Sequence, residues 1–102
     1  MEKIVKLAGI TFDCSAVRAV IDVAGGGFCE WSGNVKITLT DSIDRTTIDL
    51  TANLSGIRLV DFEGEPEDGD PIYEACEMYS IEWASEILKS LGRPSYGDAI
   101  AA

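Results

Sequence analysis

The apolar residues of this chain recur with two different spacings, and the change between them constrains the fold more than any other feature of the sequence. Before residue 62 they alternate with polar residues, as in VKITLT at 35–40 and TTIDLTA at 46–52. From residue 72 onward they recur every three or four positions. Alternation is typical of a strand with one buried face, and the longer spacing is typical of a helix with one buried face. The sequence therefore predicts a sheet followed by a helix.

The part before residue 62 reads as a series of short strands separated by turn residues. Residues 16–24 fit a helix or a strand, but their β-branched content and the following Gly25-Gly26-Gly27 favour a strand that forms a hairpin with 28–31. Ser32-Gly33-Asn34 is predicted to be a turn. The other expected strands are 3–7, 10–14, 35–40, 46–52 and 57–62. Such strands, joined by short loops, pair in an antiparallel manner with one face in water.

The helix is predicted to span about residues 71–91. Asp70 is a suitable N-cap, Pro71 suits the first helical position, and Gly92 follows the last apolar residue. Ser80 indicates a kink or a break into two helices. The apolar stripe comprises Ile72, Cys76, Tyr79, Trp83 and Ile87, widened by Ala75, Ala84, Leu88 and Leu91. This stripe requires a cover, and the apolar face of the sheet is the one available.

The expected fold class is therefore α+β, with an antiparallel β-meander of about four to six strands packed in two layers against one C-terminal helix. A chain of 102 residues is expected to form a single domain. Its parts are a β-rich region at 1–62, an acidic loop at 61–70, the helix at about 71–91 and an irregular tail at 92–102. Trp31 and Trp83 are expected to be core residues, and Trp31, beside a predicted turn, is the one whose exposure the structure should test.

The side chains that most enzymes and metal sites use are scarce. The sequence has no histidine, and Cys14, Cys29 and Cys76 form no CxxC pair. Histidine-activated nucleophiles and the usual zinc sites are therefore excluded. The glycines at 25–27 match no phosphate-binding pattern. We expect no catalysis, no cofactor and no metal. Three widely spaced cysteines argue against a disulfide framework, and they favour a reducing cytoplasm and a role in the core.

Charge is distributed very unevenly along the chain. The net charge is −10, and the ten acidic residues between Asp61 and Glu86 are accompanied by no lysine or arginine. The other eight acidic residues are balanced by eight basic ones. A surface with this field repels nucleic acid and anionic membranes, and it attracts basic proteins. We therefore expect a basic protein or nucleoprotein complex as partner, with no direct contact to nucleic acid or to membrane.

The acidic excess begins in the stretch DFEGEPEDGD at 61–70. In an extended backbone its alternating acids at 61, 63, 65 and 67 would lie on one side, about 6.7 Å apart. That spacing is about twice the charge spacing of one DNA strand, about 3.4 Å. The expected partner-binding residues are Asp61, Glu63, Glu65, Glu67, Asp68, Asp70, Glu74 and Glu77. The alternatives are a solvated connection without a partner and an irregular calcium site, for which residues 61, 63 and 65 have the right spacing.

In size, acidity and lack of catalytic residues, the chain resembles small phage-encoded inhibitor proteins such as the anti-CRISPR proteins. The resemblance is one of composition, and it assigns no residues. It implies an inhibitor of the DNA-mimic type, which docks its negative face onto a basic nucleic-acid-handling protein. An alternative is a structural or assembly accessory protein, for example of phage type, that contacts partners through the sheet. A small carboxylate-based enzyme is a third hypothesis, and a homodimer also fits the sequence.

Overall fold

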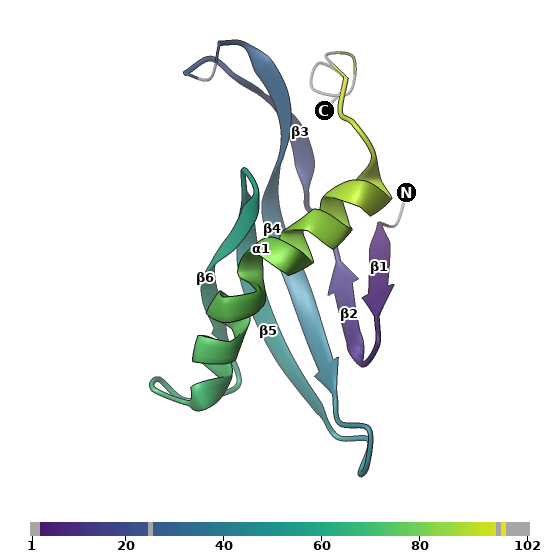
Figure 1. Cartoon of the computed structure of the whole chain (residues 1–102), viewed down its shortest axis with the longest axis vertical. Helices are drawn as coiled ribbons and strands as arrows, with labels where there is room; N and C mark the ends of the chain where they lie inside the picture. The colour runs from purple at the N-terminus through teal and green to yellow at the C-terminus, as the bar shows by residue number, and fades with distance from the viewer. Residues whose placement is uncertain (1–2, 25, 96, 98–102) are drawn as a thin grey trace.

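One helix crosses one face of a six-stranded antiparallel sheet in the computed structural model, which describes residues 3–24, 26–95 and 97 (Figure 1). The strands are β1 (Ile4–Leu7), β2 (Ile10–Asp13), β3 (Arg18–Asp22), β4 (Phe28–Thr40), β5 (Thr47–Ser55) and β6 (Arg58–Gly64), and the helix is α1 (Pro71–Leu91). The predicted α+β fold with two layers is therefore confirmed.

β4 is the central strand of the sheet. The strand order is β1-β2-β4-β5-β6, and β3 pairs with β4 outside this path. β2 pairs with the second half of β4, whereas β3 pairs with its first half. β2 and β3 therefore lie one after the other along the same side of β4, and only β2 is covered further out by β1.

Residues 18–22 form a strand, which settles the ambiguity of 16–24 in favour of the predicted hairpin with β4. The turn predicted at Ser32-Gly33-Asn34 is wrong, because β4 continues through it from Phe28 to Thr40. Gly33 serves a different purpose. A Cβ atom at this position would lie 2.8 Å from the carbonyl oxygen of Ala16 and 3.1 Å from Cα of Val17. Glycine lets the backbone between β2 and β3 pass close to the central strand.

The hydrophobic core lies between α1 and the sheet. Trp83 on α1 packs against Phe12 on β2, with 5.6 Å between the ring centroids. The helix makes its most extensive contacts with β6 and reaches across to β1 (Figure 1). The largest fully buried side chains include Phe12, Ile37, Leu50, Leu54, Leu59 and Ile87.

α1 begins and ends as predicted, and it is continuous through Ser80, so the predicted kink or break is absent. The Asp70 carboxylate accepts a hydrogen bond from the backbone N–H of Ile72 at 3.0 Å. Ser80 is buried and donates to the carbonyl oxygen of Glu77. Two members of the predicted stripe are exposed: Ala75, and Tyr79, which stacks on Trp83 and remains 45% exposed.

Trp31 is buried, which agrees with its expected place in the core. Its Nε1 donates a hydrogen bond to the carbonyl oxygen of Gly92 at 2.7 Å, and the ammonium of Lys3 lies 4.6 Å from the ring centroid. This contact joins β4 to the end of the helix, so the tryptophan is part of the core. Within the described residues, no helix is both long and apolar enough to cross a membrane.

Candidate functional site

The acidic stretch begins as a strand. β6 extends to Gly64, so the first four residues of the predicted acidic loop at 61–70 belong to the sheet. Asp61 has a positive φ of 57°, and the register between β5 and β6 shifts between Thr51 and Asn53. This bulge adds a residue to the strand and changes the direction of the following side chains. The expected single row of four carboxylates is therefore not formed.

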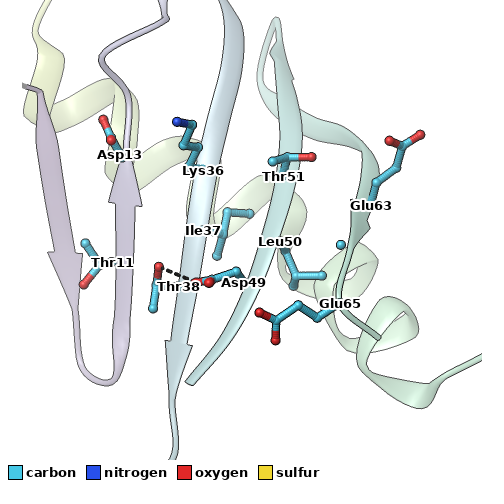
Figure 2. Close-up of a pocket in the computed structure, with 11 residues that line it drawn as sticks. Thr11, Asp13, Lys36, Ile37, Thr38, Asp49, Leu50, Thr51, Glu63 and Glu65 are labelled. Carbon is cyan, nitrogen blue, oxygen red and sulfur yellow. Dashed lines mark hydrogen bonds between the residues drawn. The ribbon is translucent and has the colours of Figure 1, made fainter. Parts of the chain in front are cut away.

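Glu63 and Glu65 line a trough on the face of the sheet that α1 leaves uncovered (Figure 2). The trough has a volume of about 620 Å³. Its wall residues come from β2, β4, β5, β6 and the residue after β6, and they include three threonines, Thr11, Thr38 and Thr51. Glu65 extends toward β5, whereas Glu63 points outward (Figure 2).

Two further carboxylates line this trough, and both are held by hydrogen bonds. Asp49 accepts from the hydroxyl of Thr38 at 3.0 Å. Asp13 accepts from the hydroxyl and the backbone N–H of Ser15, and these bonds hold the pKa of Asp13 below its ordinary value. Lys36 is the one basic residue in the lining. With four carboxylates and one ammonium, the trough is a negative, hydroxyl-rich surface.

Asp61 lies in a second depression, between β6 and α1. This groove has a volume of about 280 Å³, and Glu77 on α1 also lines it, together with Arg58. Glu74 precedes Glu77 by three residues, so the two carboxylates lie on the same side of the helix. The acidic residues therefore lie on both sides of β6: Glu65 lies in the trough with Glu63 at its rim, and Asp61 and Glu77 line the groove beside the helix (Figure 2).

The connection between β6 and α1 is fixed by its own backbone. The N–H of Glu65 donates to the carbonyl oxygen of Asp49 at 3.1 Å, and the N–H of Asp70 donates to that of Glu67 at 3.1 Å. The hydroxyl of Tyr73 donates to the carbonyl oxygen of Pro66 at 2.6 Å, which ties the connection to the first turn of the helix. None of these contacts engages a carboxylate, so the carboxylates of Glu65, Glu67 and Asp68 stay exposed to water.

Almost all carboxylates of the acidic stretch and of α1 lack a hydrogen-bonding or ionic partner among the residues that the structure describes. Among the described residues, Asp70 caps the helix and Glu86 pairs with Lys89 at 3.5 Å. The exposed carboxylates without such a contact to any described residue are Asp61, Glu63, Glu65, Glu67, Asp68, Glu74, Glu77 and Glu82. A partner with lysine or arginine side chains could therefore bind these carboxylates without first breaking an ion pair.

Of the predicted site residues, the structure brings Glu63 and Glu65 together in the trough and Asp61 and Glu77 together in the groove. Glu67 and Asp68 remain on the connection, and Asp70 is engaged as a helix cap. Sequence reasoning missed Asp13 and Asp49, which join the trough from β2 and β5. Alternation does place both on the wet face, but only the strand order shows that they lie near β6.

The geometry does not favour calcium binding or reactive cysteines. Asp61 is separated from Glu63 and Glu65, so the spacing typical of a calcium loop does not converge on one point. In the described part of the chain, no group of three histidine, cysteine or acidic side chains is placed to hold a metal ion. Cys14 and Cys76 are fully buried, and burial raises the pKa of Cys76 and raises that of Cys14 to about 11, so both remain protonated thiols at neutral pH.

The sequence matches no family model, and neither a curated protein nor a solved structure is significantly similar to it.

Proposed function

We propose that this protein acts by binding, without catalysis, and that its acidic surface docks onto a basic protein that handles nucleic acid. The acidic surface comprises Asp61, Glu63, Glu65, Glu67, Asp68, Asp70, Glu74 and Glu77. The carboxylates would take the places of phosphates at lysine and arginine side chains in a nucleic-acid groove. The protein would thereby exclude nucleic acid from that groove and act as an inhibitor.

The observation that carries this proposal is that seven of these eight carboxylates have no hydrogen-bonding or ionic partner among the described residues. Like charges gathered in this way repel one another. A cationic partner relieves that repulsion. The hydrogen bonds from Glu65 and Tyr73 also hold the connecting backbone in place before binding, which reduces the entropy lost on association.

The proposal is tested by capturing partners from a cell lysate on the immobilised protein and then washing with an excess of duplex DNA. We expect basic proteins to be retained at low salt and released both by DNA and by high salt. A variant with Glu63→Gln, Glu65→Gln and Glu67→Gln keeps shape and polarity and should retain much less. Partners that DNA does not displace, and that the variant binds as well as the wild type, would contradict the proposal.

The second candidate function is that of a structural or assembly protein that makes its contacts through the sheet. The exposed apolar residues of the β3–β4 hairpin favour it, since Val23 is 82% and Phe28 is 70% exposed. Contacts of this kind are mainly apolar, so they should persist at high salt and in the presence of DNA. The same capture experiment therefore distinguishes the two functions.

A further inference from the structure

We propose that the outer edge of β3 pairs with β3 of a second copy of the chain, so that the two sheets join into one across a two-fold axis. The argument starts from how the edges of the sheet are protected. Among the described residues, β1, β3 and β6 each have one side without a strand partner. Unprotected strand edges tend to pair with other strands, and proteins usually block them with lysine, proline, bulges or a covering element.

Two of the three edges carry such protection. β1 is only four residues long and contains Lys6, and Lys3 directly precedes it. β6 contains the bulge with Asp61 at positive φ, and α1 packs most extensively against it. β3, with the sequence RAVID, has no lysine or proline, and its register with β4 is regular over all five residues. Among the described residues, β3 is thus the edge that has no lysine, proline, bulge or second strand to protect it.

The hydrogen-bonding direction of β3 follows from its hairpin. The N–H of Gly27 donates to the carbonyl oxygen of Asp22 at 2.8 Å, so this carbonyl points toward β4. Alternate residues of a strand direct their backbone groups to opposite sides. Val20 and Arg18 therefore also face β4. Ala19 and Ile21 direct their N–H and C=O groups to the outer edge, where a second strand can bind.

If β3 of a second copy pairs in an antiparallel manner with Val20 on the two-fold axis, the outward N–H and C=O groups of both strands are hydrogen-bonded. Ala19 of one copy then lies opposite Ile21 of the other, and each such pair exchanges two hydrogen bonds. Val20 lies opposite Val20 of the second copy in a pair without hydrogen bonds, where the Cα atoms approach to about 4.5 Å. RAVID is self-complementary in this register.

The charges agree with the same register. Arg18 and Asp22 lie two residues to either side of Val20 and on the same face of the strand, so Arg18 of each copy lies opposite Asp22 of the other. In the single chain, Nη1 of Arg18 donates to the carbonyl oxygens of Ser15 and Val17. The guanidinium has further N–H groups on Nε and Nη2 that can reach a carboxylate.

Apolar side chains at this edge would be buried by the pairing. Val20 is 41% and Ile21 is 44% exposed in the single chain. Phe28, which is opposite Asp22 in the β3–β4 hairpin, is a diagonal neighbour of Val20 on the open face of the sheet. A contact built on one strand of five residues is smaller than a standard protein interface. The dimer is therefore expected to be reversible and to depend on concentration.

Among the described residues, no strand covers the outer side of β3. β2 and β3 occupy successive parts of the same side of β4, so β1 covers β2 and not β3 (Figure 1). The acidic surface lies around β6, at the opposite edge of the sheet. Dimerisation through β3 would leave both acidic surfaces exposed, and it does not depend on the proposed function.

Sedimentation velocity over a range of concentrations tests the dimer. The wild type should shift from monomer to dimer as its concentration rises. Val20→Lys places two ammonium groups against each other at the two-fold axis and should weaken association by about tenfold or more. Ile4→Lys is the matched control, because Ile4 is also 41% exposed and lies on edge strand β1. Circular dichroism of each variant reports whether the monomer is folded.

Two further variants test the register. R18D and D22R should each weaken the dimer, and the double swap R18D/D22R should restore it, because each pair then regains opposite charges. Val20→Cys in a Cys29→Ser background should form a covalent dimer under mild oxidation, since about 4.5 Å between Cα atoms suits a disulfide. Ile4→Cys in the same background should not. A monomer at all concentrations, or a dimer that Val20→Lys leaves intact, would overturn the proposal.

Discussion

Gly64 is the residue at which the sheet tolerates a side chain least. A Cβ atom there would lie 2.4 Å from the carbonyl oxygen of Asp49 and 2.8 Å from Cα of Leu50. Both contacts are to the backbone of β5, which is held by β4 on its other side and cannot move away easily. Because Gly64 is not at positive φ, its role is purely one of space. It lets β6 approach β5 and thereby places Glu63 and Glu65 at the trough.

Gly64→Ala should therefore lower the free energy of unfolding by about 1–3 kcal/mol, the usual effect of overpacking. Urea denaturation measures it. The control is Glu63→Ala, because Glu63 is exposed on the same strand and its truncation should change stability by less than about 0.5 kcal/mol. If Gly64→Ala were as stable as Glu63→Ala, β6 would have room to move and the trough would not be fixed by this contact.

The stability of α1 depends on one side chain that precedes the helix, that of Asp70. The Asp70 carboxylate accepts the N–H of Ile72, and Pro71 occupies the first turn, where it needs no hydrogen-bond acceptor. Asp70→Ala should reduce the free energy of unfolding by about 1 kcal/mol, the typical effect of losing an N-cap. Asp68→Ala removes the same charge two residues earlier without removing a cap, so it should have little effect. Equal stabilities of the two variants in thermal unfolding would mean that the cap does not stabilise α1.

The elements also show which parts of the fold could be predicted from the sequence. The bounds of α1 followed from Asp70, Pro71 and Gly92, because capping residues act on their immediate neighbours. The continuity of β4 through Gly33 could not be predicted in this way. That glycine is required by the backbone of Ala16 and Val17, which reaches it only in the folded sheet. The hydrogen bond that holds Trp31 could not be predicted either, since its partner Gly92 is distant in sequence.

In the candidate site, too, the local features could be predicted from the sequence, and the features that depend on strand pairing could not. The acidic excess was visible in the sequence, because ten acidic residues without a basic one form a local pattern. The trough was not visible, because Asp13 and Asp49 join Glu63 and Glu65 only through the pairing of β2, β4, β5 and β6. The bulge at Asp61 was also missed. It depends on a register shift between two strands, for which the alternating sequence gave no signal.

At the scale of the whole molecule, the distribution of charge should affect partner binding more than the net charge does. A negative field concentrated around one edge of the sheet attracts a basic partner from a distance and orients its approach. Such steering appears mainly in the association rate, and salt screens it. The triple variant Glu63→Gln, Glu65→Gln, Glu67→Gln removes three charges from this edge. Glu30→Gln, Asp41→Asn, Asp44→Asn removes three from elsewhere, and the asparagines at 41 and 44 keep acceptors for the N–H groups of Ile43 and Thr46.

The most direct measurement is the association rate of each variant with a captured, DNA-displaceable partner, determined by surface plasmon resonance at several salt concentrations. If the acidic surface binds the partner, the variant altered at 63, 65 and 67 should associate about tenfold or more slowly than the wild type, with a flatter dependence on salt. The variant altered at 30, 41 and 44 has the same net charge as the variant altered at 63, 65 and 67, and it should associate much faster. Equal association rates for the two variants would mean that only net charge matters, and a slower rate for the second would place the contact away from β6.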